Sequence, residues 1–123
     1  MTLKNIMKKN KEDSYVQEVT PVVNIRDEEN AVVLEAEMPG LLEENISVEV
    51  QGDELFISGK RLNEIPKGYS SLYQERIPIE YKRTFTLGSD IDRGNIEAHY
   101  ENGILAVKLK RSEDAQPRKI KVL

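Results

Sequence analysis

The chain has no cysteine, no tryptophan and a single histidine among its 123 residues. Without cysteine there is no disulfide framework and no thiol chemistry, and one histidine is too few for the usual zinc sites. We therefore expect no cofactor and no bound metal. The sequence also lacks an apolar run long enough for a signal peptide or a membrane span, which predicts a cytoplasmic protein with no membrane partner.

A strong charge of one sign is missing as well. The chain carries 22 acidic and 18 basic residues, for a net charge of -4. Nucleic-acid binding requires a basic face, so we expect no nucleic-acid partner. The one basic cluster, Lys8, Lys9 and Lys11, is followed at once by Glu12 and Asp13, a pattern typical of a solvated tail.

The residues that catalysis would need are also scarce. His99 is the only histidine, strand alternation points it toward solvent, and the chain has no Gly-x-Ser-x-Gly elbow for a serine nucleophile. Glu43 and Glu44 lie on a predicted turn and read as solvated charges. A sugar-binding module would want aromatic residues in a cleft, and the chain has only seven aromatics. We predict that the protein is not an enzyme.

What the chain does have is apolar residues at a spacing of two, between Pro21 and Lys110. Such alternation predicts half-buried strands, and the Asn102-Gly103 pair favours a tight hairpin because both residues tolerate positive φ. The length suits one domain, so we predict an all-β antiparallel sandwich. The alternating runs are Val32, Leu34, Ala36 and Met38; Ile46, Val48 and Val50; Leu55 and Ile57; Tyr81, Phe85 and Leu87; Ile96, Ala98 and Tyr100; and Leu105, Val107 and Leu109.

Both ends of the chain lie outside this pattern. In the first twenty residues, Leu3, Ile6 and Met7 have helical spacing, which predicts at most a weak amphipathic turn that forms against a partner. At the other end, Ile120 and Val122 alternate with lysines after a proline, which predicts an extended strand.

Three blocks carry a family resemblance. "EMPGLLEENISVEVQGDELFISGKR", from Glu37 to Arg61, closely resembles the centre of the α-crystallin domain of small heat-shock proteins. "AHYENGILAVKLKR", from Ala98 to Arg111, resembles the Ala-x-x-x-Asn-Gly-x-Leu signature of that family, and Ile120-Lys121-Val122 resembles its Ile-x-Ile/Val tail motif. The three blocks occur in the order and spacing of the bacterial and plant branch. The signature residues are Pro39, Gly40, Gly59, Ala98, Asn102, Gly103 and Leu105.

The resemblance implies an immunoglobulin-like sandwich of seven or eight strands. It divides the chain into a short N-terminal arm (1–20), an α-crystallin domain (21–111) and a C-terminal extension (112–123). It also implies an obligate dimer, further assembly into homo-oligomers, and ATP-independent holding of unfolding client proteins in the stress response. The expected partners are therefore the chain itself, client proteins and longer-armed relatives.

In the branch that the chain resembles, dimers form by exchange of a strand carried on a long loop. Leu62 to Glu80 is long for a hairpin connection, and such loops usually have a function. We predict the segment from Ser71 to Arg76 as the swapped strand; the alternative is a solvated loop with a local hairpin. The residues assigned to the exchange and its interface are Leu72, Tyr73, Glu75, Arg76 and Arg83.

Arg83 lies on the same strand face as Tyr81 and Phe85. A buried guanidinium is costly unless it is paired, so Arg83 must find a carboxylate or lie at an edge that a partner covers. Glu75 and Glu80 are the nearby acids in sequence. The alternative is an arginine that points outward from a bulged strand.

The tail motif requires an acceptor. Two apolar residues on one face of a strand can insert into an exposed groove. By resemblance, this groove lies between two strands, one carrying Ile46, Val48 and Val50 and the other carrying Ile96, Ala98 and Tyr100. Docking between subunits and docking within one subunit both stay open, as does a frayed tail that docks nowhere.

The chain departs from the family in its arm, which contains no phenylalanine or tryptophan within its first twenty residues. Because longer arms supply client-binding surface and packing, we expect a dimer, a small oligomer or co-assembly with a longer-armed relative rather than a large shell. The alternative function is a co-chaperone-like or structural interaction module that lacks general holdase activity.

Overall fold

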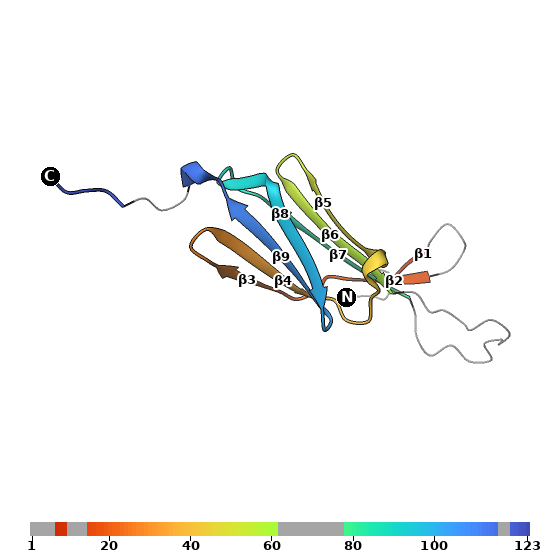
Figure 1. Cartoon of the computed structure of the whole chain (residues 1–123). Helices are drawn as coiled ribbons and strands as arrows, with labels where there is room; N and C mark the ends of the chain where they lie inside the picture. Colours follow the sequence, from red (N-terminus) through yellow and green to blue (C-terminus); the bar gives the residue numbers. More distant parts are fainter. Residues whose placement is uncertain (1–6, 10–14, 62–77, 116–118) are drawn as a thin grey trace, which may run out of the picture.

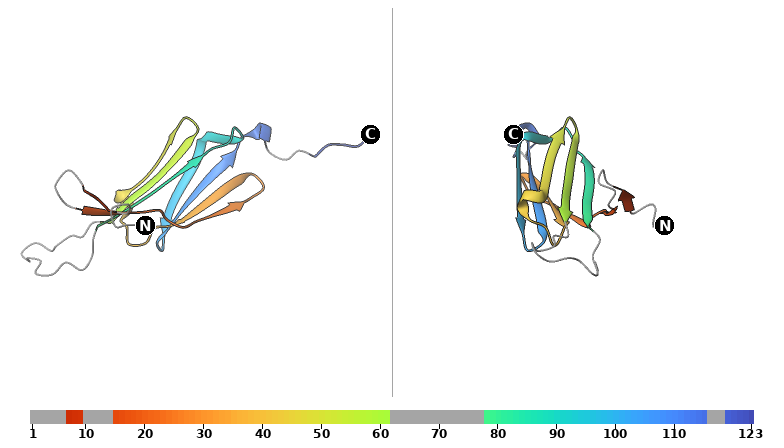
Figure 2. Two further views of the ribbon diagram at one scale, coloured as in Figure 1. Left: turned by 180° about the vertical axis from the view of Figure 1, so that it is seen from behind. Right: turned by 90° about the vertical axis from the view of Figure 1, so that its right-hand side faces the viewer.

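The computed structural model of the chain describes residues 7–9, 15–61, 78–115 and 119–123. These residues form a sandwich of two sheets, with strand orders β1-β2-β7-β6-β5 and β3-β4-β9-β8 (Figures 1 and 2). The described part has nine strands, more than the seven or eight expected, because the arm adds two. The strands are β1 Met7–Lys9, β2 Tyr15–Val19, β3 Val23–Asp27, β4 Ala31–Glu37, β5 Ile46–Gln51, β6 Glu54–Arg61, β7 Ile79–Thr86, β8 Ile91–Glu101 and β9 Ile104–Arg111.

Helix is limited to two short 3₁₀ turns in the described residues, η2 (Glu43–Asn45) and η3 (Glu113–Ala115). Across those same residues, we find no helix with the length and apolar character needed to cross a membrane.

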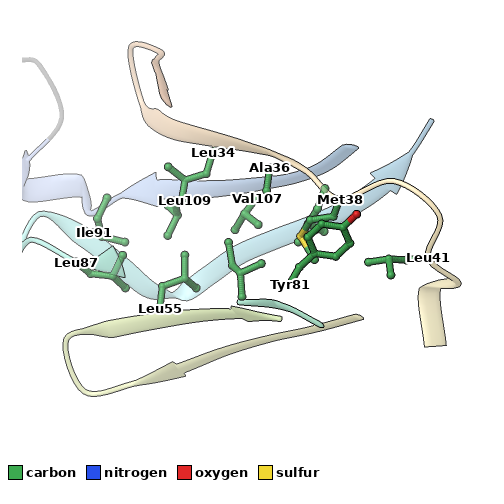
Figure 3. Packing of buried hydrophobic residues seen from close by; sticks show 12 residues of the cluster. Leu34, Ala36, Met38, Leu41, Leu55, Tyr81, Leu87, Ile91, Val107 and Leu109 are labelled. Carbon is green, nitrogen blue, oxygen red and sulfur yellow. The ribbon is translucent and has the colours of Figure 1, made fainter. Parts of the chain in front are cut away.

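The core lies between the two sheets and follows the predicted alternation (Figure 3). One face of β4 and β9 packs against one face of β6 and β7, and no charged residue belongs to the buried set in the described residues. The predicted all-β sandwich is therefore confirmed. The buried cluster consists of Leu34, Ala36, Met38, Leu41, Leu55, Ile57, Tyr81, Leu87, Ile91, Leu105, Val107 and Leu109.

The Asn102-Gly103 turn joins β8 to β9 as predicted. Both residues have positive φ, 52° and 79°, as a two-residue hairpin turn requires. A Cβ at Gly103 would lie 3.3 Å from the Pro39 Cα, and the Met38 amide donates to the Gly103 carbonyl at 2.8 Å. The two signature turns therefore pack directly on each other at one end of the sandwich.

Strand β8 begins earlier than the predicted run at Ile96, and it contains a large bulge. Ile91 pairs with Arg111 and Ile96 with Leu109, so the chain advances five residues along β8 while it advances only two along β9. The Arg93 side chain holds the bulge, donating to the Gly88 and Ile91 carbonyls at 3.1 and 3.0 Å. It also donates to the Gly52 carbonyl at 3.2 Å and pairs with Asp53 at 2.9 Å, which ties the β5–β6 turn to β8.

The N-terminal arm forms strands where the sequence predicted a weak helical turn. Met7 begins β1, which pairs antiparallel with β2, and β2 pairs parallel with β7. The edge of β7 explains this difference: the Gln17 amide donates to the Pro78 carbonyl at 2.8 Å, so the arm gains backbone partners that an isolated helical turn lacks. Leu3 and Ile6 lie outside the described residues.

The C-terminal tail is not a strand in this structure, contrary to the prediction. Residues 119–123 extend away from the sandwich beyond η3, and the side chains of Ile120 and Val122 are 84% and 92% exposed (Figure 1). A strand needs the backbone of a neighbour, and the tail pairs with none of the strands in the described ranges. The tail leaves the domain at the end opposite η2.

Candidate docking groove

A groove opens between β5 and β8, which are each the last strand of their sheet. It has a volume of about 320 Å³, and we call it the β5–β8 groove. Because both strands are edges, the groove is flanked by backbone groups without a strand neighbour on that side in the described sheets. The lining residues are Glu43, Ile46, Val48, Ala98, His99, Tyr100 and Leu105.

The structure brings together four of the six residues predicted for this groove. Ile46 and Val48 come from β5, and Ala98 and Tyr100 come from β8. On each strand the two residues are two positions apart, a separation of about 7 Å on one face. Val50 and Ile96, the other two, pack against the core farther along the same strands and do not line the groove.

Two tyrosines hold the end of the groove at the turn that contains Pro39. The Tyr100 hydroxyl donates to the Met38 carbonyl at 2.8 Å and accepts from the Leu41 amide at 3.3 Å. The Tyr81 hydroxyl donates to the Pro39 carbonyl at 3.2 Å. Tyr100 therefore lines the groove with its ring and fixes the neighbouring turn with its hydroxyl.

The change Tyr100→Phe tests this role. We expect the free energy of unfolding to fall by about 1–2 kcal/mol, because a partly buried amide and carbonyl lose their shared partner. Tyr81→Phe is the matched control and should cost less, since Tyr81 makes one such bond. Urea unfolding at a fixed protein concentration measures both changes, and equal losses would contradict the bridging role of Tyr100.

Three lining residues were missed by the sequence analysis. Glu43 was read as a solvated charge and His99 as pointing to solvent; both are exposed, yet both border the groove. His99 Nε2 lies 3.3 Å from the Glu101 carboxylate. Leu105 was predicted as core and is 2% exposed, but it also forms part of the groove floor. No local sequence pattern marks these positions as groove residues, because their place there depends on how the two sheets meet.

No group of three or more histidine, cysteine or acidic side chains able to hold a metal occurs in the described ranges.

Arg83 lies on the face predicted for it, with Tyr81 and Phe85. Its guanidinium donates to the Pro21 carbonyl at 3.1 Å and lies 5.2 Å from the centre of the Phe85 ring. Glu80, one of the two nearby acids, pairs instead with Lys82 at 3.3 Å, and Glu75 lies outside the described residues. A backbone carbonyl and an aromatic face thus accommodate the charge.

The predicted swapped segment lies outside the described residues, including Leu72, Tyr73, Glu75 and Arg76. Its two ends are described: Arg61 and Ile79 pair with each other across β6 and β7. On the other sheet, β3 is an outer strand, and two exposed apolar residues lie on it or directly before it: Ile25 in the strand, at 62%, and Val22 before it, at 61%.

Comparison with known proteins gives consistent matches. A sequence model described as Hsp20/alpha crystallin family matches residues 24–123. A probable 15 kDa heat shock protein of Leptospira interrogans is 38% identical over 96 residues, which are 78% of this chain and 73% of that protein. Spore protein SP21 of Stigmatella aurantiaca is 33% identical over 103 residues, 83% of this chain but only 61% of the relative, so the chain spans less than two thirds of that protein.

Solved structures agree. Heat shock protein 16.0 from Schizosaccharomyces pombe has a TM-score of 0.64 at 29% identity, covering 85% of this chain and 98% of that one. A small heat-shock protein from Xylella fastidiosa, described as having a distinct high order structure, also has a TM-score of 0.64 at 29% identity, covering 85% of this chain and 96% of that one.

Proposed function

Because the chain belongs to the Hsp20/alpha crystallin family, the family of small heat-shock proteins, we propose that it is an ATP-independent chaperone of the holdase type. In this role it binds partly unfolded proteins and prevents their aggregation. The observation that carries the proposal is the pairing of an open apolar groove with an exposed apolar tail in one chain.

The proposed organisation keeps the three parts expected from the sequence: an arm (1–20), an α-crystallin domain (21–111) and an extension (112–123). The arm is attached to the domain through the pairing of β2 with β7. The extension follows directly on β9.

We propose that the tail docks into the β5–β8 groove of another subunit. Ile120 and Val122 are two positions apart, the same spacing as Ile46 and Val48 in the groove, so both side chains can insert at once. Burial would contribute about 1.5–3 kcal/mol for each side chain before the cost of ordering the tail. The groove is bordered by Glu43 of η2, whereas the tail leaves the domain at the end opposite η2. Docking between subunits is therefore favoured over docking within one subunit.

We propose that the dimer forms when the segment from Ser71 to Arg76 adds to the outer edge of β3 in a second subunit. That edge has no strand neighbour in the described sheets, and the exposed Val22 and Ile25 provide apolar surface beside it. The proposed interface includes Arg83, which the Pro21 carbonyl links to the chain entering β3.

Client binding uses the same physical property as assembly. A partly unfolded protein exposes segments with alternating apolar residues, which resemble the tail motif in shape. Each tail contact is weak, so one contact can open while others keep the assembly together, and the freed groove can then cover a client segment. The proposed partners are therefore a second copy of the chain, unfolding proteins and longer-armed relatives. A cytoplasmic location and the lack of enzymatic activity stay predictions.

The test compares the full chain with a chain that ends at Arg111. Assembly mass and suppression of the aggregation of a model client are measured for both. We expect the full chain to form the larger assembly and to suppress aggregation at equimolar concentration. Equal masses would contradict the assembly role of the tail. Failure of both chains to suppress aggregation, even in excess, would favour the interaction module without holdase activity.

A further inference from the structure

The rim of the β5–β8 groove carries negative charge. Glu43 lines the groove beside Ile46, and the Glu101 carboxylate lies 3.3 Å from His99, which also lines it. The lining includes no lysine or arginine. Glu43 thus borders the apolar floor directly, and Glu101 contacts the lining through His99.

Lys108, a basic residue of β9, does not line the groove. Lys108 lies on the outer face of its sheet, where it pairs with Glu28 at 3.7 Å. On η2, Glu44 follows Glu43 and adds another exposed acid. On β5, Glu49 lies 3.5 Å from the Ser47 hydroxyl and adds no positive charge. None of these three neighbouring groups adds a positive charge to the groove lining.

The tail has the opposite charge. Lys119 and Lys121 alternate with Ile120 and Val122, and both lysines are exposed. In an extended segment, side chains alternate between two faces, so Ile120 and Val122 can enter the groove while the lysines stay at the rim. A basic tail therefore has the charge opposite to that of Glu43 and Glu101, and its alternation allows the lysines to stay outside the groove.

We propose that Glu43 and Glu101 select the occupant of the groove by charge. The selected occupant is the tail of a second copy of this chain, whose Lys119 and Lys121 face the two carboxylates. The same apolar pair flanked by acidic residues is disfavoured. This inference rests on the proposed docking of the tail, and it adds a determinant of specificity that apolar burial alone does not supply.

The expected effect is moderate because all four groups are exposed. Exposed charge pairs strengthen an interaction by only a small factor, so we expect the two rim carboxylates together to tighten tail binding about 3- to 20-fold at low salt. Most of this gain should disappear at about 1 M salt, where the screening length falls to about 3 Å. The apolar part of the binding should remain.

The experiment uses a labelled peptide with the sequence of residues 117–123, PRKIKVL. Its binding to the full chain carrying Ile120→Ser and Val122→Ser, whose own tail no longer competes, is followed by fluorescence anisotropy at low and high salt. The rim variant adds Glu43→Gln and Glu101→Gln to that chain. The matched control adds Glu29→Gln and Glu113→Gln, two exposed acids in the β3–β4 turn and in η3.

We expect the rim variant to bind about 3- to 20-fold more weakly at low salt and the control to bind as before. A peptide with Lys119→Glu and Lys121→Glu should bind the original rim more weakly still, and it should bind the rim variant more tightly than the original rim because like-charge repulsion is removed. If the original peptide binds but all variants bind it equally, the charge selection is wrong while the docking stands. If the original peptide does not bind at either salt concentration, the docking itself is wrong.

Discussion

The double change Ile120→Ser and Val122→Ser is expected to reduce the assembly to a dimer. Each tail then loses the apolar burial that docking provides, about 3–6 kcal/mol before ordering costs, which corresponds to at least a hundredfold weaker contact. The proposed contact of the swapped segment with β3 does not involve the tail, so the dimer should persist. Native mass spectrometry or sedimentation at several concentrations measures the change.

Leu123→Ser is the matched control for this experiment. Leu123 is also fully exposed and lies next to Val122, but the alternation of an extended chain points it away from the face of Ile120 and Val122. Its replacement should leave the assembly mass unchanged. A double variant with the mass of the original chain would contradict tail docking, as would an original chain that is itself no larger than a dimer.

The fold could be predicted from sequence because its determinants are local. Alternation in β4, β6 and β9 places one face in the core, and the Asn102-Gly103 turn sets the β8–β9 register through its backbone conformation. Each of these signals lies within about ten residues of the structure it determines. Long-range contacts then follow from burying the apolar faces together.

The groove could be predicted only in part for the same reason. Alternation identified Ile46, Val48, Ala98 and Tyr100, and family resemblance paired their strands. How far the groove extends depends on where the edges of β5 and β8 diverge, which no local pattern encodes. Leu105 therefore lines the groove although it was not predicted to do so. Val50 and Ile96 were predicted to line it, but they pack against the core without lining the groove.

The two chain ends show that alternation does not by itself make a strand. The arm, with a mixed pattern, forms strands because the edge of β7 is available to β2. The tail, with a clear alternating pattern, stays extended and exposed because it pairs with no strand of the part of the chain that the structure describes. The availability of a partner for backbone hydrogen bonds decides both outcomes.

The bulge that Arg93 holds in β8 could not be predicted from sequence either. It depends on carbonyl groups from three separate turns and strands, those of Gly52, Gly88 and Ile91.

Leu105→Ala and Leu55→Ala are expected to lower stability by similar amounts and to differ in their effect on docking. Leu105 and Leu55 are 2% and 0% exposed and belong to the same core cluster. Each truncation should lower the free energy of unfolding by about 2–5 kcal/mol, through lost burial and the cavity left behind. Denaturant unfolding at one fixed protein concentration measures this, because assembly makes apparent stability depend on concentration.

Docking separates the two variants because only Leu105 lines the β5–β8 groove. Its truncation removes methyl groups from the floor that Ile120 or Val122 would contact, so the peptide of residues 117–123 should bind several-fold more weakly. Leu55→Ala leaves the groove lining intact, and its peptide affinity should match that of the original chain at a temperature where both variants are folded. Equal weakening in both variants would mean that lost core packing, rather than the groove floor, controls docking. Unchanged binding in Leu105→Ala would show that the tail does not contact this floor.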